Sequence, residues 1–421
     1  MRNILFVICI LFFADQKSYA VNNWEQKADF PGDGRSAVSS FGFSDFGFVG
    51  LGYDGEDFRR SFYAYDPIMD SWFQTESLGG AIGEGLERNV AAAFTIGNKG
   101  YIGTGQGGDP FLNDFWEYNY LTNVWTVKPS VGGIDRRSGI GFSVEGKGYI
   151  GLGQDASGLK KDLWQFDTLS NTWTQKADYG GTPRRFAVAF VIESRVFVGT
   201  GDDGAFKNDI YEYNAGANAW FLRNEFGGSA RYGSAAFSLN GKGYLVCGYD
   251  TTLTNRNDFW EYDPILDSWL QLPDFPGGAR SNLTAFVIDT MAFVGMGYDT
   301  GFHYDIWLWG DTTNIIQQDT TDTTLAVMNL ILPLKNIDFF PNPVKSYATV
   351  NINSHINFTN ATIRVFDMQG NDVSSSCNWS KISYFNNTTS FTFQNKDLPK
   401  GVYQLVFTQG EVEGVKKFIV I

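Results

Sequence analysis

Six tryptophans recur at a nearly constant interval through the first two thirds of the chain. Their spacings are 48, 53, 48, 47 and 49 residues, and the six are Trp24, Trp72, Trp125, Trp173, Trp220 and Trp269. Polar turn segments such as residues 263–268 precede them. Self-similarity at about 40 to 50 residues is typical of β-propeller blades, because one small antiparallel sheet cannot bury both of its faces alone. The interval therefore predicts an all-β fold in which similar sheets form a ring.

Each repeat unit carries three further landmarks at fixed positions before its tryptophan. An arginine opens the unit and a phenylalanine follows six residues later; the six arginines are Arg35, Arg88, Arg136, Arg184, Arg231 and Arg280. A Gly-X-Gly pair comes next, with Val246 and Gly248 as the one imperfect copy. The third landmark is an aromatic strand, such as residues 114–118 or 258–262. Because large rings alternate every second residue, we expect these aromatics to pack in the core between neighbouring sheets.

The two ends of the repeat region complement each other. After Trp309 the pattern stops without its closing tryptophan strand, whereas residues 23–27 stand alone before the first arginine. The amino-terminal strand can therefore complete the last sheet, which removes an exposed edge that would otherwise template aggregation. We predict six blades, the sixth built from both ends of the repeat region.

The repeat resembles the kelch family over residues 22–310. The glycine pair, the later tyrosine and the spaced tryptophan match, although most copies here read Gly-X-Gly where the family has adjacent glycines. The resemblance implies a six-bladed kelch-type β-propeller closed by its amino-terminal strand. Kelch propellers include protein-binding modules, sugar mutarotases and copper oxidases, so the family implies architecture more strongly than activity.

Four segments are expected along the chain. Residues 1–20 have Arg2, an apolar run of about ten residues and small residues at 18 and 20, which predicts a cleaved secretory signal peptide. A membrane anchor is the alternative, but a span needs about 20 apolar residues, and no other segment qualifies. Residues 21–310 are the predicted propeller. Residues 311–337, which contain three Asp-Thr-Thr sequences and no aromatic residue, are a predicted linker; these sequences resemble an O-glycan acceptor motif of Bacteroidetes-type bacteria, with a plain polar spacer as the alternative.

Alternating apolar residues return in the last segment, residues 338–421. Runs such as residues 402–407 and 416–421 are separated by turn residues, which predicts a small β-sandwich. The order of residues 340–343, 366–370, 398–403 and the lysine-led last strand is similar to the type A sorting domain of the type IX secretion system. That resemblance implies contact with outer-membrane secretion and sorting machinery, and a secreted or cell-surface location. An immunoglobulin-like binding domain is the alternative.

Charge and cysteine content limit the partners. The chain has a net charge of −14, and loss of Arg2, Asp15 and Lys17 with the signal peptide would make it −15. An acidic body repels phosphate backbones and anionic membranes, so we expect no nucleic-acid partner. Cleavage would leave Cys247 and Cys377, which fall in different predicted domains, so no disulfide framework is expected. We expect a monomer.

Residues suited to metal or redox chemistry are scarce. The only histidines are His303 and His355, and only His303 lies in the propeller segment. One imidazole cannot assemble a copper site, so galactose-oxidase activity is disfavoured, and we expect no metal, cofactor or catalytic set. Five aspartates sit two residues after the second glycine of their repeats: Asp54, Asp155, Asp203, Asp250 and Asp299. Such repetition favours turn formers that bond their own backbone, with Ca²⁺ ligation as the alternative.

The six repeat arginines are the candidate ligand-binding residues. Because they share one register at the start of the innermost strand, we expect them around one mouth of the channel. Six cationic groups in an acidic protein must be neutralised by carboxylates or by an anionic ligand. Two interpretations stay open: structural pairing across blades, or direct recognition of acidic side chains or acidic sugars. Loops that differ between blades, such as residues 106–113 and 203–208, are expected to set specificity.

The sequence favours a non-catalytic recognition module for a glycan or a protein, displayed or released outside the cell. The alternative is a carbohydrate-acting enzyme, a mutarotase or epimerase of an acidic sugar. In that case an arginine would hold the sugar carboxylate while a glutamate such as Glu56 or Glu225 moved protons.

Overall fold

The computed structural model describes residues 23–310, apart from 81–85, 109–110 and 134. In the C-terminal region it describes residues 330–331, 337–340, 344, 347–353, 362–367, 371–385, 388–409 and 412–420. The predicted signal peptide, most of the predicted linker and His355 lie outside the described residues. The four domain boundaries stay predictions.

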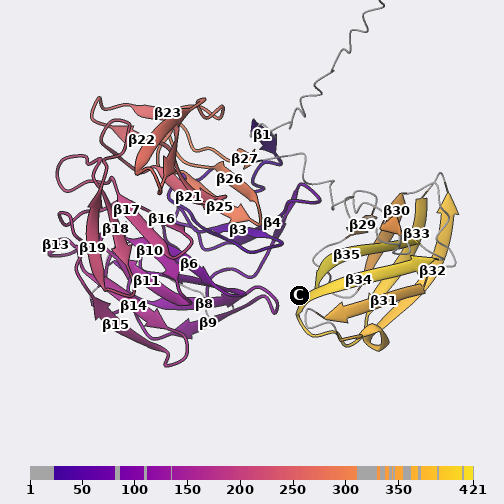
Figure 1. Cartoon of the computed structure of the whole chain (residues 1–421). Helices are drawn as coiled ribbons and strands as arrows, with labels where there is room; N and C mark the ends of the chain where they lie inside the picture. Colours follow the sequence, from indigo (N-terminus) through magenta and orange to yellow (C-terminus); the bar gives the residue numbers. More distant parts are fainter. Residues whose placement is uncertain are drawn as a thin grey trace, which may run out of the picture.

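Residues 23–310 form six antiparallel sheets arranged around one axis, which confirms the predicted six-bladed propeller (Figure 1). The kelch assignment stays a prediction. Blades 1 to 3 contain β2 (Ser39–Gly42), β3 (Gly47–Gly50), β4 (Phe62–Asp66) and β5 (Ser71–Gln74); β6 (Ala92–Ile96), β7 (Lys99–Gly103), β8 (Phe115–Asn119) and β9 (Val124–Lys128); and β10 (Ile140–Val144), β11 (Lys147–Gly151), β14 (Leu163–Asp167) and β15 (Thr172–Lys176), with a hairpin of β12 (Gln154–Asp155) and β13 (Gly158–Leu159).

Blades 4 to 6 repeat this arrangement. They contain β16 (Val188–Ile192), β17 (Arg195–Gly199), β18 (Ile210–Asn214) and β19 (Ala219–Arg223); β20 (Arg231–Tyr232), β21 (Ala235–Leu239), β22 (Lys242–Asp250), β23 (Asn255–Asp263) and β24 (Ser268–Leu272); and β25 (Thr284–Ile288), β26 (Met291–Gly295), β27 (Ile306–Gly310) and β1 (Asn23–Lys27).

The amino-terminal strand closes the ring, as the sequence predicts. β1 pairs antiparallel with β27, and Trp24 lies opposite Trp309 in the register. The Trp24 ring centroid lies 5.0 Å from that of Phe259 and 5.2 Å from that of Trp309. Both ends of the repeat region therefore meet in blade 6, and the closing tryptophan packs into the core shared with blade 5.

The tryptophan interval has a simple structural cause. The indole N–H of an outer strand donates to a backbone carbonyl at the end of the preceding blade, as in Trp72 to Ala28 (2.8 Å) and Trp125 to Glu76 (2.9 Å). The turn residue before the same strand accepts a backbone N–H from that neighbour, as Asp70 does from Ala28 at 2.7 Å. Four tryptophans fasten the outer edge of their blade to the previous blade in this way, whereas the indole N–H groups of Trp24 and Trp269 have no hydrogen-bond partner among the described residues. The spacing therefore equals one blade.

The repeated phenylalanine packs between neighbouring blades. A Cβ atom placed on Gly148 would lie 2.1 Å from the ring of Phe94 in the preceding blade, so only glycine leaves room for that ring. Phe94 itself stacks on Tyr101, with centroids 5.3 Å apart. The landmark six residues after each arginine is therefore a core residue that sets the distance between inner strands.

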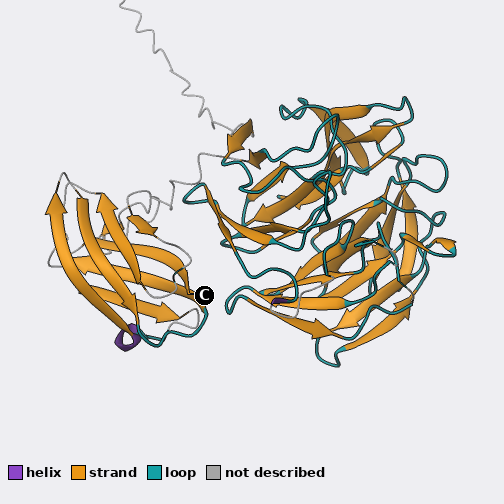
Figure 2. Cartoon of the chain, turned by 180° about the vertical axis from the view of Figure 1, so that it is seen from behind, coloured by secondary structure: helices purple, strands orange, loops and turns teal. Residues whose placement is uncertain are grey.

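The C-terminal region contains two four-stranded sheets with a shared core (Figure 2). One is β28 (Leu330–Ile331), β35 (Val412–Val420), β34 (Gly401–Gln409) and β31 (Thr362–Asp367); the other is β29 (Ile337–Phe340), β30 (Tyr347–Asn353), β33 (Thr388–Asn395) and β32 (Cys377–Phe385). A short 3₁₀ turn, η4 (Ser374–Ser376), precedes β32. Phe393 and Phe418 meet across the two sheets at 5.2 Å, which confirms a small β-sandwich. No helix among the described residues has the length and apolar character of a membrane span.

Candidate ligand-binding site

Five of the six repeat arginines are paired inside their own blade. Their guanidinium groups contact the aspartate at the start of the aromatic segment, which lies just before the strand in four blades and within β23 in blade 5. The pairs are Arg88 with Asp114, Arg136 with Asp162, Arg184 with Asp209, Arg231 with Asp258 and Arg280 with Asp305. In the first pair, the two Nη atoms each lie 2.6 Å from a carboxylate oxygen. These five arginine side chains are at most 1% exposed. Bidentate pairing therefore occupies the guanidinium fork in five blades.

All six arginines also hold strands and blades together. Nη1 of each donates to the carbonyl oxygen of the central Gly-X-Gly residue, 16 positions later, at 3.0–3.2 Å. The arginine's own carbonyl accepts a backbone N–H from the preceding blade, as Arg88 does from Gly52 at 2.8 Å. The side-chain partners belong to the same blade, whereas the expected pairing was across blades. Ligand recognition by the six arginines stays a prediction, and the geometry of five of them matches a structural role.

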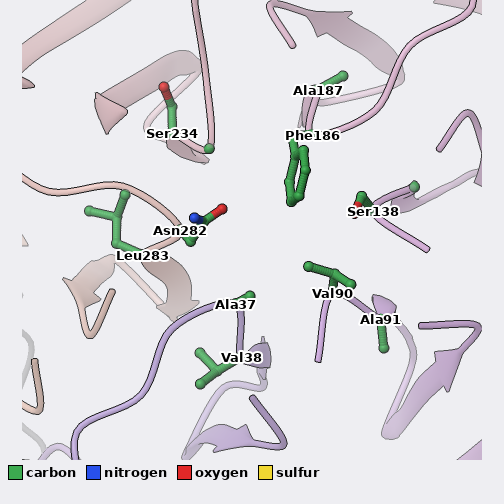
Figure 3. Close-up of a pocket in the computed structure, with 12 residues that line it drawn as sticks. Ala37, Val38, Val90, Ala91, Ser138, Phe186, Ala187, Ser234, Asn282 and Leu283 are labelled. Carbon is green, nitrogen blue, oxygen red and sulfur yellow. The ribbon is translucent and has the colours of Figure 1, made fainter. Parts of the chain in front are cut away.

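The arginine side chains do not line the channel mouth. A cavity of about 190 Å³ at this end is lined instead by residues two and three positions after each arginine, such as Val90, Ser138 and Phe186 (Figure 3). The six residues at the first of these positions have left-handed φ angles of 48–67°: Ala37, Val90, Ser138, Phe186, Gly233 and Asn282. Each donates its backbone N–H to the same position in the preceding blade, at 2.7–3.4 Å. A closed circle of six hydrogen bonds therefore ties all blades together at the mouth.

The side chains next to this circle form a surface that we call the mouth face. Each blade contributes three residues joined by antiparallel bridges: the residue after the arginine, the residue after the second glycine, and the bridge partner of the latter. Bridged residues lie on one side of a sheet. The sets are Ser36, Tyr53 and Phe58; Asn89, Gln106 and Phe111; Arg137, Gln154 and Leu159; Arg185, Asp202 and Phe206; Tyr232, Tyr249 and Asn255; Ser281, Tyr298 and Phe302.

A polar network crosses the mouth face in blades 2 to 4. Arg137 donates to the side-chain oxygens of Gln106 and, at 3.1 Å, Gln154. Arg185 donates to the same Gln154 oxygen at 2.9 Å and to Asp202 at 2.9 Å. Burial and repulsion from Arg185 lower the pKa of Arg137 below its usual value. The network holds two cations and one carboxylate, so it is positive in a chain whose net charge is −14.

Aromatic rings form two further groups on the mouth face. Tyr232 lies 5.0 Å from Phe206 and 5.6 Å from Tyr249, measured between ring centroids. On the other side, Phe302 lies 4.9 Å from Tyr298 and 5.8 Å from Tyr53. Burial, with Tyr249 and Asp202 nearby, raises the pKa of Tyr232, and Arg185 opposes that shift. The aromatic and polar sectors therefore meet around Tyr232.

The five repeated aspartates are turn formers, as predicted. Each accepts a backbone N–H from a residue one to three positions later, as Asp250 does from Thr252 at 2.9 Å. Each also contacts a basic side chain on the far side of its loop: Arg59, Lys160, Lys207, Arg256 and His303. Blade 2 has Gly107 and Leu112 in place of this pair. The aspartates therefore stabilise the loops around the mouth face, since each one binds both the backbone and a basic side chain of its own loop.

The other candidate groups are not gathered at one site. His303 Nε2 lies 3.0 Å from Asp299 in that loop of blade 6. Glu56 and Glu225 are exposed and belong to blades 1 and 4, and Glu225 accepts a hydrogen bond from Asn208 at 3.0 Å. Among the described residues, no group of three or more His, Cys, Asp or Glu side chains has the arrangement of a metal site.

The sequence reasoning missed Arg137 and Arg185. It singled out the arginine shared by all units, whereas the cations of the mouth face are the second members of the doublets 136–137 and 184–185. The signal was the variation at that position, which is serine, asparagine, arginine or tyrosine in different blades. The constant residue is buried inside its blade, whereas the varied residue after it lies on the mouth face.

Comparison with known proteins concerns the C-terminal region. Residues 338–421 match the family model of the secretion system C-terminal sorting domain. This confirms the predicted sorting domain, and with it type IX secretion and export to the cell surface or beyond. No curated protein matches the chain.

Proposed function

We propose that the propeller is a recognition module that binds an acidic glycan across the mouth face after export. The observation that carries this proposal is the joining of a positive polar network and an aromatic sector around Tyr232. Arginine forks recognise carboxylates with two parallel hydrogen bonds, and flat aromatic side chains offer large contact area at a small entropy cost. A sugar acid presents both a carboxylate and an apolar ring face.

The lining of the channel favours binding across the mouth rather than inside it. Three cavities of about 190, 190 and 260 Å³ follow one another along the channel, and none of the residues that line them is charged, whereas ligand pockets hold a few polar groups that fix the orientation of the ligand. The first of these cavities lies at the mouth. Its wall is a hydrogen-bonded backbone circle, which resists widening. We therefore expect the ligand to lie on the mouth face and to reach the channel with one group at most.

Binding should be measured by calorimetry with uronic-acid and sialic-acid oligosaccharides and with neutral oligosaccharides of equal length. We expect binding of an acidic ligand that weakens as salt rises, because the arginines are partly exposed. The double variant Arg137→Gln/Arg185→Gln should weaken this binding by about 10- to 100-fold. The matched control, Lys99→Gln/Lys147→Gln, removes two charges at the opposite end of the propeller and should bind normally. Binding of acidic peptides alone would assign the face to a protein ligand instead.

Catalysis on an acidic sugar stays the alternative prediction. Glu56 and Glu225 are exposed on different blades, and among the described residues neither one forms an ion pair or hydrogen bond with Arg137 or Arg185. Anomer exchange of sialic and uronic acids, followed by NMR with and without the protein, tests this activity directly. Faster exchange that is lost in Arg137→Gln/Arg185→Gln would replace recognition by catalysis as the role of this face.

A further inference from the structure

Blade 1 lacks the carboxylate that neutralises the repeat arginine in the other five blades. The position of Asp114 in blade 2 is occupied by Ser61 in blade 1, and Tyr63 stands where four blades have tryptophan. The backbone is otherwise equivalent. Leu51 N donates to Ser61 O at 3.1 Å, just as Thr104 N donates to Asp114 O at 3.2 Å. The difference is therefore confined to the side chains.

Arg35 nevertheless stays buried like its counterparts. It is 3% exposed, its Nη1 donates to Leu51 O at 3.2 Å, and the guanidinium lies 5.0 Å from the centre of the Phe30 ring. Its Nε has no hydrogen-bond partner among the described residues, which is also true of Arg136 and Arg280, so the missing aspartate is what distinguishes Arg35. Burial lowers the pKa of Arg35, and Arg59 adds to that effect, while Tyr63, Asp54 and Asp33 oppose it. An arginine stays charged in proteins, so this buried cation is incompletely compensated.

The position next to the repeat arginine can be reached from solvent in the other five blades. In the other blades the aspartate of the pair is 17–27% exposed, so the outer edge of each fork faces water. Ser61 is shorter than aspartate and half-buried. The hydroxyl groups of Ser61 and Tyr63 make no hydrogen bond to another described residue. In blade 2 the residue at the latter position, Trp116, donates its indole N–H to the pairing carboxylate at 2.7 Å.

We propose that Arg35, with Ser61 and Tyr63, forms a binding site for the carboxylate of a ligand, which takes the place of the missing aspartate. The carboxylate accepts two hydrogen bonds from the guanidinium fork and one from each hydroxyl. This site goes beyond the recognition proposed for the mouth face and does not depend on it. In blade 1, the carboxylate that pairs with the repeat arginine therefore comes from a ligand, whereas in the other five blades it comes from an aspartate of the same blade.

Neighbouring charges define the alternatives. Asp54 is bound by Arg59, and the Asp57 carboxylate lies 3.8 Å from Arg59 Nη1. The Asp33 side chain is 79% exposed and lies 3.9 Å from Arg59. Among the described carboxylates, those of Asp54 and Asp33 act on the pKa of Arg35. Because Arg59 holds Asp54, Asp33 is the one of these two with freedom to turn toward Arg35, and the test must separate it from a ligand.

The test uses the full chain with acetate as the probe, at pH 7 and constant ionic strength made up with chloride. Unfolding is followed by tryptophan fluorescence, because eleven of the twelve tryptophans precede residue 310. We expect acetate to raise the unfolding midpoint more than chloride. The folded-to-unfolded ratio should rise about tenfold once acetate is ten times its dissociation constant.

Three variants decide the outcome. Ser61→Asp copies the other blades, so it should raise the midpoint without acetate and abolish the acetate response. Asp114→Ser makes a second such site in blade 2, and should lower the midpoint and gain a second response. Asp33→Asn should change neither. Equal effects of acetate and chloride, an acetate response that persists in Ser61→Asp, or a loss of stability in Asp33→Asn as large as in Asp114→Ser would each overturn the proposal.

Discussion

Arg136 and Arg137 are neighbours in the sequence but belong to two different regions of the molecule. Arg136 is fully buried and holds Asp162 with two hydrogen bonds of 2.6 and 2.8 Å. Arg137 is half-exposed and shares Gln154 with Arg185 on the mouth face. The first position is arginine in all six blades, whereas the second differs between them. In this ring, the constant residues build the frame, and the varied residues beside them form the surface available to a ligand.

The largest effect is expected from removing one buried arginine. Arg136→Met leaves Asp162 without its partner, and breaking such a pair costs about 3–5 kcal/mol because a charge stays uncompensated in the interior. Urea unfolding followed by tryptophan fluorescence measures the change. The double variant Arg136→Met/Asp162→Leu should recover most of the loss. A single variant as stable as the wild type would remove the distinction between the two regions.

A smaller effect is expected on the mouth face. Arg137→Gln/Arg185→Gln should weaken binding of an acidic glycan by about 10- to 100-fold, since hydrogen bonds between charged groups contribute about 1.5–3 kcal/mol. Its unfolding free energy should change by less than about 1 kcal/mol, because both side chains are partly exposed. Calorimetry and urea unfolding of the same preparation give both values. A loss of stability equal to that of Arg136→Met would show that the arginines of the mouth face also stabilise the fold.

The smallest effect is the expected loss of unfolding free energy when the pH is lowered. Burial alone would raise the pKa of Asp250, but hydrogen bonds from Ser229, Thr252 and Arg256 hold it well below its usual value. The folded form therefore binds its proton at lower pH than the unfolded form, so this stability is present above about pH 4 and is lost as pH falls below that. Asp54, Asp155, Asp203 and Asp299 show lowered pKa values in the same loops.

The measurement is the urea midpoint of the propeller between pH 7 and pH 2. Asp250→Asn should reduce stability at pH 7 by about 1–3 kcal/mol, since it leaves buried hydrogen-bond donors poorly matched. Its stability should also fall less steeply with acid than that of the wild type. Identical slopes for both proteins would exclude Asp250 from the groups that couple folding to pH.

Much of the frame could be predicted because the same sequence pattern occurs in all six blades. The closing strand followed from a missing tryptophan strand after Trp309, and the structure pairs Trp24 with that residue. The pairing of the arginines could also have been inferred, since an aspartate opens the aromatic strand in five units and Ser61 does so in the first. The direction of that pairing, within rather than across blades, depends on side-chain placement that periodicity does not give.

The candidate site was harder to predict, for a physical reason. Consecutive strand residues point to opposite faces, so Arg136 and Arg137 differ only in which face each one takes. Composition cannot distinguish two adjacent arginines. The aromatic sector was similarly hidden, because Tyr249, Tyr298 and Tyr53 look like ordinary core residues of a chain that is 16% aromatic.

The most direct measurement compares Arg136→Lys with Arg137→Lys. Lysine keeps the charge in both variants but removes the planar fork. For Arg136→Lys we predict a lower unfolding midpoint and unchanged glycan affinity of the folded protein. For Arg137→Lys we predict an unchanged midpoint and weaker binding. Equal losses of stability in the two variants, or a loss of affinity confined to Arg136→Lys, would contradict the division between a buried arginine frame and a recognising mouth face.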